Sequence, residues 1–127
     1  LLDQSMDLLL DIFSPANYQE FKRVLAPDGR LIKVIPTATH LQEIRQKVKD
    51  HLDQVDYSNE QIIQHFSDHF TIENTIHCQE RFELTPALRE ALLSMTPLLF
   101  HVDPAQIDWT DLTQVTISAT ILIGRSN

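Results

Sequence analysis

Short apolar runs separated by helical patterns are the most regular feature of the first third of the sequence. Residues 8–13 are apolar except for Asp11, and residues 31–35 form a second strand-like run. Near-continuous apolar runs are typical of strands in parallel sheets that are covered on both faces. Between the two runs, Asn17 can cap a short helix that ends in a turn at residues 26–29. The pattern therefore predicts a strand, a helix and a parallel strand joined by a right-handed crossover.

The rest of the chain alternates between helical and extended patterns. Apolar residues recur at helical spacing between residues 41 and 55, and Ser58 signals the start of another helix. Residues 70–84 alternate between apolar and polar, which predicts a long strand with Cys78 on its inward face. Thr85 followed by proline is a typical helix start. The strict alternation at residues 115–123 is the clearest strand signal in the chain.

Composition limits the classes of protein that fit this pattern. The 127 residues suit one domain, residues 1–127, and no apolar run is long enough for a transmembrane helix. With no recognisable signal peptide, the sequence predicts a cytoplasmic protein. The formal net charge of −8 opposes tight binding of RNA by this chain alone, so an RNA partner would need basic surface from elsewhere.

Metal and thiol chemistry have little support in the sequence. His65 and His69 have a spacing that can place two imidazoles on one metal, but no third ligand accompanies them and we predict no metal site. Cys78 is the single cysteine, so an internal disulfide is excluded. It lacks an evident base nearby, and we expect it to serve in packing.

The segment FKRVLAPDGRLIKVIP resembles the part of class I S-adenosylmethionine-dependent methyltransferases that joins their fourth and fifth strands. The resemblance implies an α/β fold: the C-terminal half of a Rossmann-like methyltransferase domain, with flanking helices on a mixed four-stranded sheet. It also implies that the last strand is antiparallel and lies between residues 31–35 and 70–84. The tip of the first strand, Ile12-Phe13-Ser14-Pro15, would then face the methyl donor and the substrate, as expected for the carboxyl end of a parallel strand.

A second segment, LLSMTPLLFHVDP, narrows the resemblance to the 23S ribosomal RNA guanine-N1 methyltransferases. In that family Met95, Thr96 and Pro97, together with Phe100 and His101, would belong to the substrate side of the cleft. By residue type alone these residues also fit a helix end with a buried apolar lid. The resemblance implies an intact enzyme that transfers a methyl group to guanine N1 of ribosomal RNA.

The features that hold the cofactor in this class are missing from the sequence. A glycine-rich loop normally lets backbone N–H groups approach the ligand, and the two glycines, Gly29 and Gly124, lie in no such loop. The cysteine-rich zinc module of the guanine-N1 enzymes is missing as well. The chain also begins at Leu1, directly before a strand that needs neighbours. We therefore expect an inactive fragment that binds S-adenosylmethionine weakly or not at all by itself.

A proton must leave guanine N1 during methylation, and two groups of this chain could accept it. Asp11 lies near the functional end of its strand and is our candidate catalytic base, although it could simply pair with a neighbouring cation. His101 is the other group expected near the cleft. The resemblance assigns the role to neither of them.

Two other functions fit the same residues. One is a fragment of a small-molecule methyltransferase, because the first motif is shared widely; the other is a complete, non-catalytic α/β interaction domain. The upstream gene sequence would distinguish them from the RNA enzyme, which requires four cysteines at zinc spacing and a glycine-rich loop. In the fragment, residues 8–13 would form an unpaired apolar edge, so we expect a homo-oligomer formed through the truncated side of the sheet.

Overall fold

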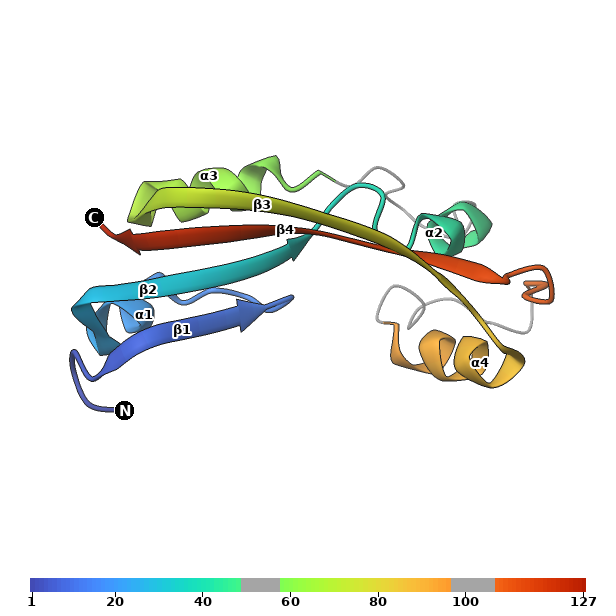
Figure 1. Ribbon diagram of the computed structural model, residues 1–127, viewed down its shortest axis with the longest axis horizontal. Coiled ribbons are helices and arrows are strands. Elements are labelled where there is room, and N and C mark those ends of the chain that lie inside the picture. Colours follow the sequence, from blue (N-terminus) through green and yellow to red (C-terminus); the bar gives the residue numbers. More distant parts are fainter. Residues whose placement is uncertain (49–57, 97–106) are drawn as a thin grey trace. The chain divides into compact units, whose positions relative to one another are not determined.

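The computed structural model describes residues 1–48, 58–96 and 107–127. Four strands and four helices are described in this part of the chain (Figure 1): β1 (Met6–Ile12), α1 (Tyr18–Val24), β2 (Leu25–Pro36), α2 (Gln42–Val48), α3 (Glu60–His69), β3 (Phe70–Glu83), α4 (Pro86–Met95) and β4 (Gln114–Ser126). No helix among the described residues is both long and apolar enough to cross a membrane.

The strands form one mixed sheet in the order β1-β2-β4-β3. β1 is parallel to β2, whereas β2 is antiparallel to β4. β3 is antiparallel to β4 as well, because Leu84 N donates to Thr113 O (2.7 Å) while Thr71 Oγ1 donates to Asn127 Oδ1 (2.7 Å). The predicted strand order is confirmed, including the antiparallel last strand between the second and third.

The contacts within the chain divide it into two compact units. The first unit contains Leu1–Thr37, Ser58–Cys78 and Ala119–Asn127, and the second contains Ala38–Tyr57 and Gln79–Ser118. β3 and β4 contribute residues to both. The sequence predicted a single domain, and this stays a prediction.

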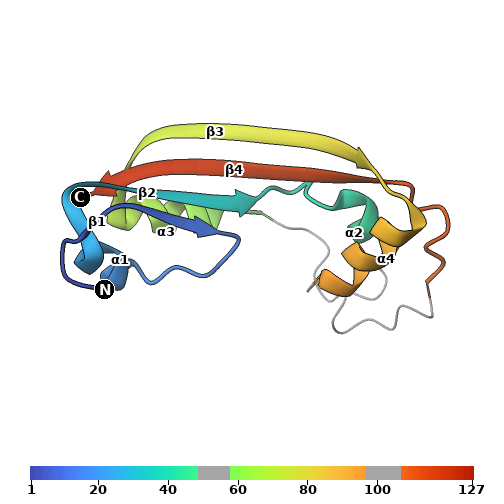
Figure 2. The same cartoon turned by 60° about the horizontal axis from the view of Figure 1, so that its bottom comes forward.

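In the first unit, α1 and α3 pack on one face of the strands (Figure 2). Strand residues alternate between faces, so every second residue of β2 points into this layer, and the burial of β2 follows that alternation. The buried cluster between sheet and helices consists of Tyr18, Leu25, Leu31, Ile35, Phe66, Phe70 and Leu122.

The opposite face of β1 carries apolar side chains that no described residue covers. Leu8, Leu10 and Ile12 are 51%, 62% and 55% exposed. The apolar run at residues 8–13 predicted burial on both faces, and that expectation is wrong for this chain. The described helices of the first unit lie on one face of the sheet, so alternate residues of β1 remain exposed.

Two further local expectations are corrected by the structure. Cys78 is exposed, because β3 is an edge strand and all of it beyond Ile72 is exposed.

The turn predicted at residues 26–29 lies within β2, where the register with β1 shifts: Met6 pairs with Leu25 but Leu8 pairs with Arg30. Between these two pairs β1 advances by two residues and β2 by five. The residues predicted as a turn therefore form a bulge in β2.

The helix starts predicted at Asn17 and Thr85 are confirmed, whereas α3 has Asn59 in its N-cap position and begins one residue later than the signal at Ser58 implied. Asn17 Oδ1 accepts a hydrogen bond from Glu20 N at 3.2 Å, and Thr85 Oγ1 accepts one from Leu88 N at 3.2 Å. Each side chain satisfies a backbone N–H group that has no partner in the first turn of its helix.

The second unit has a smaller apolar cluster of its own. Its buried residues come from α2, from the segment before β4 and from the start of β4, and they are Ile44, Val48, Leu112 and Val115. Residues of α4, including Leu92 and Leu93, pack against this cluster. The helix predicted over residues 41–55 is described as far as Val48, and the rest lies outside the described residues.

Close packing explains why position 124 is glycine. A Cβ atom at Gly124 would lie 2.6 Å from Cζ of the fully buried Phe66. We expect Gly124→Ala to lower the free energy of unfolding by about 1–3 kcal/mol, because overpacking forces core side chains to move. Urea unfolding would measure the change.

Arg125→Ala, at the exposed next position of β4, is the matched control and should change the free energy of unfolding by less than about 0.5 kcal/mol. Combining Gly124→Ala with Phe66→Leu should destabilise less than the sum of the two single changes. Simple additivity would show that the contact with the Phe66 ring is not the cause.

Candidate functional site

The tip of β1 is exposed and has an unusual backbone conformation. Residues 12–15 follow the carboxyl end of the parallel β1–β2 pair, where ligands bind in open α/β sheets, and all four are exposed. Phe13 has a φ of 51°, in the left-handed region that is an outlier for a bulky side chain. Its backbone N–H donates to Val34 O on β2 at 3.0 Å. Strained backbone of this kind often occurs at ligand sites, so the geometry is compatible with the predicted site.

A buried ion pair lies directly beside this tip. Asp11 and Lys33 are neighbours in the β1–β2 register and are 5% and 4% exposed. Lys33 Nζ donates to Asp11 Oδ2 at 2.7 Å and to Ser14 O at 3.0 Å. Ser14 Oγ donates to the other carboxylate oxygen, Asp11 Oδ1, at 2.8 Å. The carboxylate of the candidate base is therefore engaged through both oxygens.

Tyr18, from the start of α1, is buried close to the Asp11 carboxylate. Burial, and to a smaller extent the negative charge of Asp11, raise the pKa of Tyr18 from 10.0 to about 12. The tyrosine ring stacks on His69 with ring centroids 4.9 Å apart, and His65 meets it edge-on at the same distance. The two histidines at helical spacing thus take part in an aromatic cluster, and among the described residues no group of His, Cys, Asp or Glu could hold a metal ion.

The predicted substrate-side residues belong to the second unit. Met95 is 75% exposed at the end of α4, and Thr96 is buried, with its hydroxyl donating to Leu92 O at 2.6 Å. Pro97, Phe100 and His101 lie outside the described residues. A role in substrate binding stays a prediction for all five.

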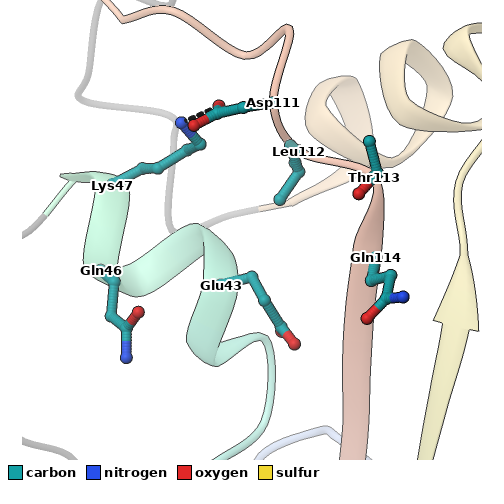
Figure 3. A pocket seen from close by; sticks show the side chains of 7 residues that line it. All are labelled: Glu43, Gln46, Lys47, Asp111, Leu112, Thr113 and Gln114. Atoms are coloured by element: carbon teal, nitrogen blue, oxygen red, sulfur yellow. Dashed lines mark ion pairs between the residues drawn. The ribbon is translucent and has the colours of Figure 1, made fainter.

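The second unit also contains an open hollow of about 400 Å³ (Figure 3). Side chains of α2 line it from one side and residues 111–114 from the other, and Lys47 forms an ion pair with Asp111. Burial tends to raise the pKa of Glu43, but hydrogen bonds from Thr116 outweigh burial and hold this pKa below its usual range. The Glu43 carboxylate accepts hydrogen bonds from Thr116 N (2.8 Å) and Thr116 Oγ1 (2.6 Å). These bonds link α2 to β4.

The glycines of the chain are explained by packing and form no ligand cradle. A Cβ at Gly29 would lie 2.8 Å from Leu25 Cδ2 and 3.0 Å from Met6 O, while Gly124 faces Phe66. The backbone cradle for a nucleotide-like cofactor is not found among the described residues.

Three curated proteins align with nearly the whole chain. YxjB of Bacillus subtilis (strain 168), provisionally named a 23S rRNA (guanine-N1) methyltransferase, is 32% identical over 96% of this chain and 44% of its own length. A protein of Micromonospora griseorubida with the same provisional name is 33% identical over 98% of this chain and 43% of its own length. The 23S rRNA (guanine(748)-N1) methyltransferase of Streptomyces fradiae is 28% identical over 98% of this chain and 46% of its own length.

The resemblance to 23S rRNA guanine-N1 methyltransferases is confirmed. The chain spans less than half the length of these relatives, as expected for a C-terminal half. No family model matches the sequence.

Solved structures confirm the fold class. A protein of Bacillus halodurans C-125, provisionally described as a methyltransferase, has a TM-score of 0.52 at 12% identity and matches 98% of this chain and 66% of its own. The MccD protein has a TM-score of 0.53 at 15% identity and matches 100% of this chain and 63% of its own. These likenesses support the Rossmann-like α/β fold of the chain.

The sequence analysis missed Lys33, which lies at the centre of the strand-tip cluster. The sequence does contain a signal for this residue. Two apolar runs are predicted to pair as strands, and each contains one charged residue, Asp11 in the first and Lys33 in the second. A charge in a buried strand requires an opposite charge nearby. Finding the pair needed the register, which places the two residues opposite each other.

The raised pKa of Tyr18 predicts a loss of stability in alkali. In the folded state Tyr18 keeps its proton up to about pH 12, whereas in the unfolded chain it ionises near pH 10. Its contribution to the free energy of unfolding is therefore fully present below pH 10 and is lost between pH 10 and about 12, by up to about 2 kcal/mol.

Urea unfolding at several pH values would measure this loss. The fall above pH 10 should be shallower in Tyr18→Phe than in the wild type. An equally steep fall in Tyr18→Phe and in the wild type would show that the assignment to Tyr18 is wrong.

Proposed function

We propose that this chain is the C-terminal part of an S-adenosylmethionine-dependent methyltransferase that methylates guanine N1 of 23S ribosomal RNA in the cytoplasm. The observation that carries the proposal is the alignment of nearly the whole chain with three relatives that share this name. The strand order, with an antiparallel last strand beside β2, supports the methyltransferase fold.

In this proposal, residues 12–15 form the wall of the site that faces the cofactor and the target base. S-adenosylmethionine supplies an electrophilic methyl group when bound, so alignment with guanine N1 would account for much of the rate. The exposed tip of β1 can provide such alignment because its neighbours on β2 hold it rigidly. Met95 and Thr96 of the second unit, with Pro97, Phe100 and His101, would contact the RNA.

The role of proton acceptor for Asp11 stays a prediction. Its carboxylate is 5% exposed and already accepts hydrogen bonds from Lys33 and Ser14. A base must reach the proton that it removes, and a buried carboxylate with both oxygens engaged is poorly placed for this. His101 lies outside the described residues, and its role as an alternative acceptor stays a prediction as well.

A chimera with YxjB tests the proposed function. Residues 1–127 would replace the aligned segment of YxjB, and 23S rRNA from cells lacking YxjB would be the substrate. We expect methylation that depends on S-adenosylmethionine and stops primer extension at a guanine, because a methyl group on N1 blocks Watson–Crick pairing. Calorimetry should detect S-adenosylmethionine binding to the chimera and little or none to the isolated chain.

Unchanged YxjB and YxjB without the aligned segment are the positive and negative controls. A chimera that unfolds cooperatively and binds the cofactor but leaves 23S rRNA unmethylated would contradict the proposed substrate. Micromolar binding of S-adenosylmethionine to the isolated chain would show that the cofactor site lies within these residues.

We also propose that the isolated chain forms homo-oligomers through β1. β1 is an edge strand in the described sheet, and Leu8, Leu10 and Ile12 form an exposed apolar row on it. An exposed apolar edge strand is a template for pairing with another chain, and a two-fold axis would make the contact self-complementary. Light scattering should therefore give a dimer or larger assembly at high micromolar concentration.

Two substitutions separate edge pairing from face packing. The N–H of Phe13 points to β2, so alternation along the strand directs the N–H of Leu10 to the open edge. Leu10→Pro would remove this outward donor and disrupt an edge-paired dimer, whereas Leu10→Lys would disrupt packing through the apolar row.

Leu88→Lys is the matched control, because Leu88 is 55% exposed on α4 in the second unit. It should leave the assembly unchanged. A wild-type chain that is monomeric at high micromolar concentration would refute the proposed oligomer.

A further inference from the structure

We propose that Lys33 is a positioning residue that fixes the tip of β1 in the geometry needed for methyl transfer. The inference rests on the proposed function for what the tip does, but the positioning itself is a property of this chain. Lys33 would act through Asp11 and Ser14 and touch neither cofactor nor RNA.

The Lys33 ammonium joins two points that bracket the exposed tip. It donates to the side chain of Asp11, the last buried residue of β1, and to the backbone carbonyl of Ser14. The hydroxyl of Ser14 closes the triangle by donating to Asp11. Residues 12 and 13 therefore lie in a short loop whose two ends are tied to one buried cation.

The loop between these ties contains the strained residue. The left-handed φ of Phe13 is unfavourable for a residue with a Cβ atom, so the surrounding structure has to impose it. The bond from Phe13 N to Val34 O holds the residue from one side, and the tie from Ser14 O to Lys33 holds the next peptide group. Without Lys33 the carbonyl of Ser14 would lose this anchor, and the tip could relax to an ordinary extended conformation.

Stability alone does not account for the pair. Burying a lysine and an aspartate has a desolvation cost that often cancels their attraction, so two apolar side chains of similar size would stabilise a core equally well. An apolar pair could not bind the Ser14 carbonyl. The distinguishing contribution of the ion pair is thus the fixed position of the tip.

Three variants of the 127-residue chain separate positioning from stability. Lys33→Met removes the cation, and Asp11→Leu with Lys33→Met replaces the buried pair by an apolar one. Lys47→Met removes an ion-paired lysine of the second unit and is the matched control. The measurement is amide hydrogen exchange at Phe13 by NMR, with exchange at Leu31 in the buried core as a separate report on global unfolding.

We expect amide exchange at Phe13 to be at least tenfold faster in Lys33→Met and to stay faster in the double variant, even where urea unfolding and exchange at Leu31 show that the double variant regains stability. Lys33→Arg, which keeps the charge and the donors, should give a smaller rise, and Lys47→Met none. A double variant with wild-type exchange at Phe13 would overturn the proposal, because the pair would then serve only packing. Unchanged exchange at Phe13 in Lys33→Met would overturn it as well.

Lys33→Met in the YxjB chimera, which keeps the Asp11 carboxylate, links the tip to function. It should lower kcat for methyl transfer at least tenfold, while the chimera still unfolds cooperatively. The exchange experiment needs neither cofactor nor RNA, so an inactive parent chimera would count against the proposed function and leave the positioning result standing. Unchanged kcat in this variant, with faster exchange at Phe13, would show that the tip geometry does not serve the reaction.

Discussion

The alternation of side chains along β2 is the constraint on which the first unit depends. Leu31 and Ile35 are 0% and 2% exposed beneath the helical layer, and Lys33 lies between them on the same face. Placing the two apolar residues in the core therefore buries the lysine as well. An ammonium group removed from water needs an opposite charge, and the parallel register with β1 supplies Asp11 directly opposite.

This arrangement links core packing to the conformation of the candidate site. Lys33 reaches the backbone of Ser14 because the strand tip is one residue pair beyond the buried ion pair. Tyr18 follows the tip and returns to the core, where burial and the Asp11 charge raise its pKa. The exposed tip is thus continuous in the chain with the buried cluster of the first unit.

The sheet and helices of this chain match part of a methyltransferase-like α/β fold. Both glycines serve packing, and the net charge of −8 opposes binding of a polyanion. The curated relatives are more than twice as long as the segment that they share with this chain. A cofactor cradle and a basic RNA-binding surface would, under the proposed function, come from the remainder of such a protein.

The sequence by itself determined the elements and much of their order. Local signals sufficed for this: alternation in β4, the Thr85 cap of α4, and the motif that joins β1 to β2. Tertiary structure decided what each strand residue faces. The apolar row of β1 and Cys78 are exposed, although their patterns predicted burial, because periodicity identifies the faces of a strand without telling which face is covered. The Asp11–Lys33 pair was likewise decided by strand register, since residues 22 positions apart become neighbours only when the sheet forms.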